Sequence, residues 1–403
     1  MTIRRTLRLR IAVLVVRAVN WASPRLGRGS GTVAGGSVGL RIAPRLLEAL
    51  AVRRTVILVS GTNGKTTTTA LIAAGWGEDL ATNDTGANMP AGQVAALVRS
   101  SSGRAVLESD EGWLGTSVEA TQPAVIVALN LSRDQLDRAS EVRQLAERWR
   151  TVFVSDRAKN SVIVANALDP LVVFAADGAP NVRWCAPPTS WTADSQSCPQ
   201  CTNPLRRSAE RWWCECGLAQ PASTSYFDGD DAIIGDVRIP LELALPGSFN
   251  RGNALVALTA LGEVGVDVTA ASKRLATVRV VAGRYDVRCV YGRPVRLLLA
   301  KNPAGFSALL ESIESDNDIW IAINARVADG HDPSWLYDVP FEILRGRRVR
   351  CLGDRRFDLA TRLWYAGVEF DVDESLVPKS DRVIDVLANY TAFSDLLAES
   401  QPC

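Results

Sequence analysis

A run of small and polar residues that follows an apolar segment has the composition of a phosphate-binding loop: Gly61, Thr62, Asn63, Gly64, Lys65, Thr66 and Thr67. Glycines let backbone N–H groups approach an anion closely, and a helix that begins at the loop adds partial positive charge. Lys65 can reach the terminal phosphates of a nucleotide, and the Thr66 hydroxyl can bind Mg²⁺. Val59 stands where the longer form of the motif has its first glycine. These residues predict an ATP site, and a plain strand-to-helix turn is the alternative.

A second chemical cluster consists of cysteines in a C-x-x-C pair and a C-x-C pair: Cys198, Cys201, Cys214 and Cys216. Thiolates at this spacing can close a tetrahedral Zn²⁺ site, and a small segment with few apolar residues needs such a link. A site with only thiolate ligands has no open position, so we predict structural zinc. Two disulfides, or reduced thiols without metal, are the alternatives.

The composition limits the class of protein. A length of 403 residues predicts two or three domains, and 47% apolar residues are enough for a sizeable core. A net charge of +1 gives no general attraction to nucleic acid. The single histidine leaves no basis for a His-based metal cage or an internal Cys-His dyad. Eight cysteines, half of them clustered, do not resemble a secreted disulfide framework, so a cytoplasmic location is expected.

The amino terminus is basic and contains no acidic residue among its first 28 positions. Arg17 interrupts its apolar run, and no run reaches the roughly 20 residues of a membrane-spanning helix. We predict a basic amphipathic helix at residues 3–21 and a linker rich in Gly and Ser at 22–40. The helix either docks on its own domain or makes a peripheral contact with the inner face of an anionic membrane.

Strand-like and helix-like segments alternate along most of the chain, which predicts a parallel sheet with helices on both faces. Expected strands lie at residues 55–60, 104–108, 124–129 and 161–165, with helices such as 66–76 and 141–151 between them. The region at about 183–225 breaks this pattern and holds the cysteines, so it reads as an inserted module. Short strands at 226–245 and a helix at 250–261 follow it.

A second α/β stretch begins near residue 285, with expected strands at 296–300, 319–323, 349–352 and 383–387. The predicted fold class is therefore α/β. A central parallel-sheet ATPase domain with an inserted Cys₄ zinc ribbon precedes a smaller carboxy-terminal α/β domain. We place the boundaries at residues 1–45 for the helix and linker, 46–284 for the central domain and 285–403 for the last domain.

The loop sequence G-T-N-G-K-T-T resembles that of Mur ligases and folylpolyglutamate synthases. Further segments resemble Mur ligase segments, at residues 83–89, 130–138, 166–170, 247–254, 283–284 and 301–305. The resemblance implies that Glu108 is catalytic and binds Mg²⁺ together with Thr66. A carboxylate at the end of a parallel strand faces the ligand crevice, and a solvated loop acid is the alternative. It also implies that Asn250 contacts adenine and that Arg284 closes on the nucleotide, whereas Gln135 replaces a metal-binding His of most members.

Three features set the chain apart from an ordinary Mur ligase. The roughly 50 residues before the ATP domain leave no room for a UDP-binding domain, and the Cys₄ insert is unusual. In the last domain, residues 329–338 read D-G-x-D-x-S-W-x-x-D. Together these features resemble the MurT family, the Mur ligase-like subunits of lipid II isoglutaminyl synthase. This resemblance implies a heterodimer with a GatD-type glutamine amidotransferase, and ATP, Mg²⁺ and structural Zn²⁺ as cofactors.

The implied reaction is ATP-dependent amidation of the α-carboxyl of D-isoglutamate in the lipid II stem peptide, through an acyl phosphate. Lys65 and Glu108 would serve this chemistry, and the partner would supply ammonia from glutamine. Asp332 would complete the partner's Cys-His pair, although an N-cap or turn role before Pro333 and Ser334 is the alternative. An amino-acid ligase that acts alone, or an ATP-binding scaffold without catalysis, are the alternative functions.

Overall fold

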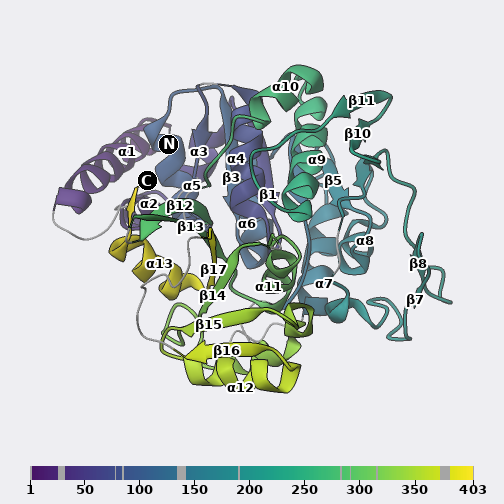
Figure 1. Ribbon diagram of the computed structural model, residues 1–403. Helices are drawn as coiled ribbons and strands as arrows, with labels where there is room; N and C mark the ends of the chain where they lie inside the picture. The colour runs from purple at the N-terminus through teal and green to yellow at the C-terminus, as the bar shows by residue number, and fades with distance from the viewer. Residues whose placement is uncertain are drawn as a thin grey trace.

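The computed structural model describes residues 2–25, 32–77, 79–83, 86–133, 142–188, 191–281, 284–290, 292–314, 316–372 and 382–402. Two large sheets, each covered by helices, form two adjoining halves of the molecule (Figure 1). The α/β class predicted from the alternating segments is confirmed. Gln135 lies outside the described residues.

The first sheet has nine strands in the order β11-β10-β9-β6-β5-β4-β1-β3-β2. Its parallel part comprises β1 (Thr55–Ser60), β2 (Ala81–Thr82), β3 (Arg104–Ser109), β4 (Val125–Ala128), β5 (Val162–Asn166) and β6 (Val182–Cys185). An antiparallel edge comprises β9 (Ser225–Asp228), β10 (Asp231–Ile234) and β11 (Val237–Pro240). The expected strands of the central domain therefore lie within one or two residues of the observed ones, and the short strands after the insert extend the same sheet.

The central strand β1 shows why this sheet is covered on both faces. Val56 and Leu58 belong to one core cluster, whereas Ile57 and Val59 belong to another. Successive side chains of a strand point to opposite faces, so an uninterrupted apolar run requires helices on both sides. One face carries α4 (Lys65–Trp76), α9 (Ser248–Glu263) and α10 (Val268–Leu275). The other carries α5 (Pro90–Arg99), α6 (Leu114–Thr121), α7 (Val142–Phe153) and α8 (Pro170–Ala176).

The second sheet has seven strands in the order β16-β15-β14-β17-β13-β12-β18. They are β12 (Tyr285–Val290), β13 (Arg293–Leu299), β14 (Asp318–Ala322), β15 (Arg348–Leu352), β16 (Glu369–Val372), β17 (Ile384–Ala388) and β18 (Gln401–Pro402). The core on one face contains α11 (Pro303–Leu310) and α12 (Arg356–Ala366), and α13 (Tyr390–Glu399) covers the other. The four strands expected here are each found, shifted by no more than a few residues.

The predicted linker at residues 22–40 is wrong over much of its length, because α2 (Thr32–Ile42) is a helix. It packs between α1 (Thr2–Arg25) and α5. Glycines make this packing close: a Cβ atom added at Gly36 would lie 1.8 Å from the Ala91 carbonyl oxygen, and one at Gly39 would lie 2.4 Å from Val16 Cγ2. The glycines of this segment do not form a loop, because they allow α2 to approach its two neighbouring helices closely.

A helix is confirmed at the predicted amino-terminal position, but its predicted amphipathic character is wrong, because apolar residues lie on two opposite sides of it. One side docks on the chain's own domain, with Ala12 and Val16 fully buried. Helix α3 (Leu46–Ala51) then leads into β1. Among the described residues, no helix combines the length and the apolar character needed to cross a bilayer.

The segment that carries the cysteines leaves the first sheet after β6 and returns at β9. Strand β6 pairs with β5 and with β9, so the region from residue 183 begins with a strand of the main sheet. Beyond it, β7 (Arg206–Arg207) and β8 (Trp212–Trp213) form a small hairpin at the periphery (Figure 1). Trp212 is buried and its indole N–H donates to the Ala167 carbonyl at 3.1 Å, which fixes the hairpin to the domain.

Candidate active site

The loop between β1 and α4 has a backbone that requires its two glycines. Gly61 and Gly64 have φ values of 149° and 85°, which residues with a side chain rarely adopt. A Cβ atom at Gly61 would lie 2.8 Å from Leu129 Cβ, and one at Gly64 would lie 2.7 Å from Asn253 Oδ1. Gly64 is also the residue that precedes α4, so the loop N–H groups and the positive end of the helix share one location.

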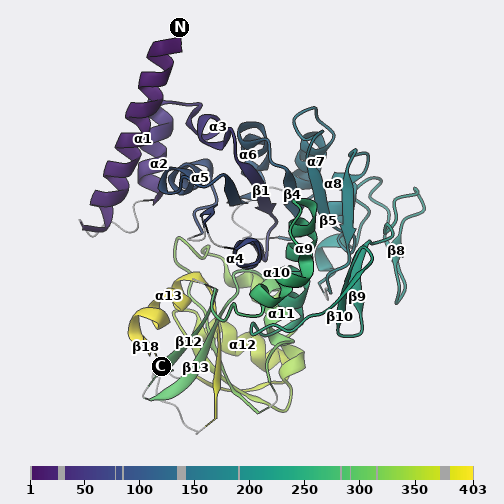
Figure 2. The same cartoon turned by 90° about the horizontal axis from the view of Figure 1, so that it is seen from above.

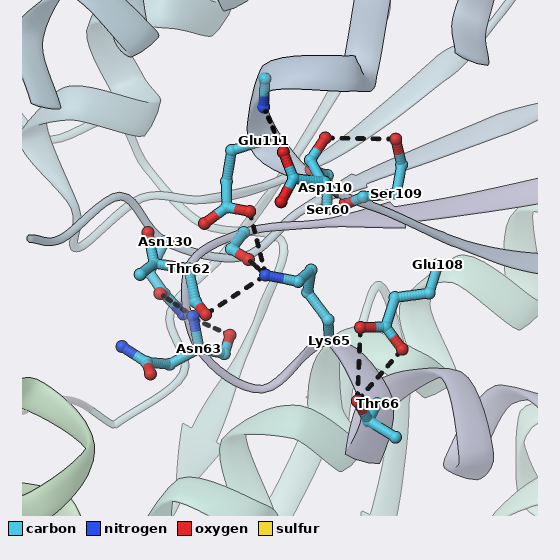
Figure 3. Close-up of polar contacts among 12 residues, drawn as sticks. Ser60, Thr62, Asn63, Lys65, Thr66, Glu108, Ser109, Asp110, Glu111 and Asn130 are labelled. Carbon is cyan, nitrogen blue, oxygen red and sulfur yellow. Dashed lines mark hydrogen bonds and ion pairs between the residues drawn. The ribbon is translucent and has the colours of Figure 1, made fainter. Parts of the chain in front are cut away.

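The residues after β4 hold this loop in place. The Thr62 N–H donates to the Asn130 carbonyl at 2.9 Å, and the Asn63 N–H donates to Asn130 Oδ1 at 2.9 Å. The Ser132 N–H donates to Thr62 Oγ1 at 3.0 Å. Figure 3 shows Asn130 beside Thr62 and Asn63. The sequence had marked this segment only by resemblance, and its contacts make the phosphate loop a preformed structure.

Lys65 is almost fully buried, at 4% exposure, and its ammonium group lies over the loop. Its Nζ donates to the Gly61 and Thr62 carbonyls and forms an ion pair with Glu111 at 3.0 Å (Figure 3). The carboxylate of Glu111, whose side chain is also largely buried, balances the charge of this cation. Glu111 is therefore part of the site, although nothing in its local sequence pattern distinguished it from Asp110.

Glu108 lies at the end of β3 and has no solvent exposure, so the alternative that it is a solvated loop acid is wrong. The Thr66 hydroxyl lies 3.1 and 3.3 Å from its two carboxylate oxygens (Figure 3). Its backbone is fixed by Asn83 and Gln93, whose amides donate to the Glu108 carbonyl at 3.0 and 3.1 Å. Burial raises the pKa of the Glu108 carboxyl above its usual range, and the nearby charge of Lys65 opposes this shift.

The pair Thr66 and Glu108 fits a small divalent cation. Mg²⁺ prefers oxygen ligands, and this pair offers a hydroxyl and two carboxylate oxygens at one point beside the phosphate loop. A buried carboxylate whose charged form is disfavoured by desolvation would gain from a bound cation. These two side chains are accordingly the candidates to hold Mg²⁺.

A cavity of about 420 Å³ lies between the phosphate loop, α9 and the second sheet. Its size is within the range of small-molecule sites. The predicted ATP-site residues that line it are Thr62, Asn63, Gly64, Lys65, Thr66, Thr67, Asn250 and Arg284. Gly61 and Glu108 lie behind this lining layer. The structure thus brings together residues separated by more than 200 positions in the sequence, since Arg284 Nε lies 3.4 Å from Thr66 Oγ1.

The second half of the molecule contributes directly to this cavity. The Asn302 amide donates to Asn63 Oδ1 at 3.0 Å, and Lys301 and Ala304 also line the cavity. A bound nucleotide would therefore contact both halves, and their relative position would affect its affinity.

The insert forms a further wall that the sequence did not reveal. Trp191, Asp194 and Ser195 line the cavity, and the Trp191 indole donates to Asp194 Oδ2 at 2.6 Å. Arg133 forms ion pairs with Asp194 and, at 3.4 Å, with Asp338 of the second half. These contacts connect the loop after β4, the insert and the last domain beside the cavity that Asp194 lines.

The sulfur atoms of the four clustered cysteines, Cys198, Cys201, Cys214 and Cys216, all lie within 4.8 Å of one another. Cys198 and Cys216 Sγ are 3.6 Å apart, and Cys201 and Cys214 Sγ are 3.4 Å apart. A tetrahedral zinc ion with bonds of about 2.3 Å requires sulfur separations of roughly 3.8 Å, whereas a disulfide requires about 2.05 Å. All four thiols are free, which contradicts the disulfide alternative and fits the predicted zinc ligands.

Metal analysis checks this site. We expect the purified chain to contain zinc in equimolar amount, and Cys198→Ser to lose it because the cluster closes through all its thiolates. Trp212 should then become more exposed, which a red shift of the tryptophan fluorescence would report. Cys185→Ser, a buried cysteine outside the cluster, is the matched control and should keep the metal. Full zinc content in Cys198→Ser would contradict the assignment.

Asp332 lies outside this cavity, on the surface of the second half. It precedes η3 (Pro333–Asp338), and its Oδ1 accepts the Ser334 N–H at 2.8 Å. The capping alternative is therefore observed, and a role toward a partner stays a prediction. His331 is exposed, whereas Asp329 is buried and accepts the Thr391 N–H at 2.9 Å, which is a structural contact.

Comparison with known proteins adds an independent result. The family model of the Mur ligase middle domain matches residues 59–184, and that of the MurT ligase C-terminal domain matches residues 299–393. The chain is 27% identical to a Staphylococcus aureus (strain COL) protein named lipid II isoglutaminyl synthase (glutamine-hydrolyzing) subunit MurT, over 96% of this chain and 97% of that protein. A Streptococcus pneumoniae protein with the same name is 27% identical, over 98% of both chains.

Solved structures share the fold. A pseudomurein peptide ligase type C from Methanothermus fervidus superimposes with a TM-score of 0.69 at 18% identity, covering 88% of this chain and 80% of that one. MurF ligase from Thermotoga maritima, solved in complex with ADP, gives a TM-score of 0.57 at 15% identity over 90% and 83%. Both halves of the sequence and the architecture that joins them lead to one conclusion. The chain belongs to the Mur ligase family, and within it to the MurT type.

Proposed function

We propose that this chain is the ATP-dependent synthetase subunit of a glutamine-hydrolysing lipid II isoglutaminyl synthase. It would convert the α-carboxyl of D-isoglutamate in the lipid II stem peptide into the amide of D-isoglutamine. The observation that carries the proposal is the buried pair Thr66 and Glu108 beside a preformed phosphate loop, in a cavity shared by both halves. Relatives named for this enzyme align with nearly the whole chain.

The reaction requires activation, because a carboxylate is a poor electrophile. One oxygen of the acceptor carboxylate attacks the γ-phosphorus of ATP, the bond to ADP breaks, and an acyl phosphate forms. Ammonia then attacks the acyl carbon, the carbon–oxygen bond to phosphate breaks, and loss of a proton from nitrogen leaves the amide. Positioning and charge stabilisation are the main contributions that a protein makes to phosphoryl transfer.

The residues of the site match these requirements. The loop N–H groups and Lys65 would bind the terminal phosphates and offset the charge that develops on them. Thr66 and Glu108 would hold Mg²⁺, which when bound neutralises phosphate charge. Asn250 and Arg284 would contact the nucleotide from α9 and the domain junction, since both line the same cavity. The walls from the insert and the second half would limit access of water to the acyl phosphate.

Ammonia would come from a second protein. Glutamine hydrolysis uses a nucleophile and a general base, and the one histidine of this chain, His331, lies exposed on a loop away from the cavity. We therefore propose a heterodimer with a GatD-type glutamine amidotransferase, whose Cys-His pair would be completed by Asp332. A carboxylate behind an imidazole fixes its tautomer and stabilises the imidazolium.

Asp332→Asn isolates that role. Asparagine keeps the cap of η3, because its side-chain oxygen can still accept the Ser334 N–H. We expect the complex with the glutaminase to form normally while glutamine hydrolysis falls by about 10⁴-fold, as for a triad that loses its carboxylate. Asp338→Asn, in the same short helix and paired with Arg133, is the matched control. Normal glutaminase activity in Asp332→Asn would leave this residue with its capping role alone.

A separate assay tests the reaction class. ATP turnover should depend on the stem-peptide acceptor and on ammonium chloride in the absence of any partner, because the synthetase site is complete within this chain. An amino acid that replaces ammonium as the nucleophile would support a ligase that acts alone. ATP binding without turnover under all of these conditions would support a scaffold instead.

The organisation of the chain follows from the same proposal. Residues 1–45 would form the amino-terminal helical part, 46–284 the ATP-binding domain with its zinc-ribbon insert, and 285–403 the partner-facing domain. The proposed substrate would be reached from the cytoplasm, at the inner face of the membrane that holds lipid II.

A further inference from the structure

Helix α1 carries a continuous apolar stripe that faces solvent. The stripe consists of Leu7, Ile11, Leu14, Ala18 and Trp21, and we call it the outer stripe. Its residues are spaced by four, three, four and three positions, which places them along one side of a helix. Leu7 is 57% exposed, Leu14 62% and Trp21 63%. Single exposed apolar residues are common, but an aligned row that runs from Leu7 to Trp21 is not.

The outer stripe is separate from the surface by which α1 docks. Ala12, Val16 and Ser23 point to the opposite side of the helix and are buried. Ala12 and Val16 belong to the core cluster of the first domain, and α1 contacts α2 and α5. The helix therefore has two apolar sides, rather than the single apolar side of the predicted amphipathic helix. Docking on the domain uses one of these sides, and the other is exposed to solvent.

Basic residues border the outer stripe on both sides. Helical periodicity places Arg10 and Arg17 along one edge and Arg8 along the other, and all three are exposed. The Arg8 guanidinium also donates to the Ile42 carbonyl of its own domain, so Arg10 and Arg17 are the arginines with the clearest access to an outside surface. The first acidic residue of the sequence is Glu48, so no carboxylate of the chain's first 47 residues offsets this charge. Arginine side chains can reach past an apolar surface to a polar layer at its border.

We propose that the outer stripe docks α1 on an anionic lipid surface, with the helix lying in the plane of the interface. Leucine, isoleucine and tryptophan in one row, bordered by arginine, are the chemistry of such interfacial helices. The stripe from Leu7 to Trp21 spans about 21 Å along the helix axis. Figure 2 shows α1 along the outer edge of the molecule, where a flat surface could approach it.

The arginines beside the outer stripe disfavour the two other partners that could cover it, a second copy of this chain and a helix of another protein. A second copy of the chain that paired through this stripe would bring the arginine borders of two α1 helices together, and like charges at such an interface oppose association. A partner helix would need acidic borders of its own. An anionic bilayer supplies both an apolar interior and negative headgroups, and each arginine near such a surface adds attraction.

This inference goes beyond the proposed reaction and does not depend on it. None of the residues of the outer stripe lines the ATP cavity. Lipid binding and ATP chemistry can therefore fail separately, and each can be measured on the same protein.

Vesicle sedimentation with the full chain tests the proposal. We expect the protein to sediment with phosphatidylcholine vesicles that contain phosphatidylglycerol and to stay in solution with phosphatidylcholine alone. Arg10→Gln with Arg17→Gln should weaken binding roughly fivefold for each arginine removed. Leu7→Gln with Leu14→Gln should abolish it. The matched control is Phe357→Gln with Trp364→Gln, on α12 of the second half, where exposures of 63% and 67% are similar.

Three results would overturn the proposal. They are no sedimentation of the wild type with anionic vesicles, equal sedimentation of the Leu7 and Leu14 variant, and a wild-type dimer that this variant converts to a monomer. Equilibrium binding of ATP to each variant serves as the folding control and should be unchanged. If anionic vesicles bind the protein but amidation is absent, the proposed reaction fails and this inference stands.

Discussion

Lys65→Ala is expected to lower kcat/KM for ATP-dependent amidation by on the order of 10²–10³-fold, the usual effect of removing one preorganised group that offsets transition-state charge. Lys65 is the ammonium group that lies directly over the phosphate loop and lines the cavity. Its loss also leaves Glu111 as a nearly buried carboxylate without this ion pair, which should lower the free energy of unfolding.

Two measurements separate these effects. Lys65→Ala combined with Glu111→Gln removes both charges, so it should recover stability without recovering activity. Lys159→Ala, an exposed lysine paired with Asp156, should change neither. Amidation at the wild-type rate in Lys65→Ala, with the fold shown intact by circular dichroism, would contradict the role given to this lysine.

Glu108→Gln is expected to separate function from stability. The amide has nearly the same shape and can still accept the Thr66 hydroxyl, but it is a poor ligand for Mg²⁺. Activity should fall by at least about 10²-fold, because charge on the phosphates would be less well neutralised. The thermal midpoint measured without nucleotide at neutral pH should rise instead, because a desolvated carboxylate is replaced by a neutral group.

The pH dependence has a definite sign. Burial raises the pKa of Glu108 in the folded protein, so the unfolded chain releases this proton at lower pH than the folded chain does. Between the ordinary pKa of a glutamate and the raised one, the folded state binds more protons, and stability falls as pH increases. The gain in thermal midpoint from Glu108→Gln should therefore be small at acidic pH, below the ordinary range of glutamate, and larger at neutral pH. A loss of stability at neutral pH would contradict this interpretation.

Much of the fold and of the site could be predicted, because in these segments the local sequence pattern by itself determines the position of the residues in the folded protein. A β-branched apolar run such as Thr55–Ser60 can only be a strand that is buried on both faces, and the glycines after it occupy backbone conformations that other residues avoid. Four thiolates at zinc-ligand spacing likewise carry their geometry in the sequence.

Other features depend on contacts with residues that are distant in the sequence, and a single sequence does not show which residues those are. The glycines of α2 looked like a linker because their neighbours, Val16 and Ala91, come from other helices. Glu111 and Asp194 are not marked by their own sequence context, because the cations that pair with them, Lys65 and Arg133, lie far away in the sequence. Resemblance to Mur ligases located the segments of the site, and only the fold showed that the insert forms one of its walls.

Transfer of oxygen from acceptor to phosphate is the most direct test of the proposed chemistry. In this experiment, a stem-peptide acceptor whose α-carboxylate carries oxygen-18 is incubated with this chain, ATP and ammonium. The inorganic phosphate that is released is then analysed by mass spectrometry. Formation of an acyl phosphate predicts one heavy oxygen atom in each phosphate released, in step with amide formation. Unlabelled phosphate accompanying the amide would show that ATP does not activate this carboxylate, and the proposed mechanism would be wrong.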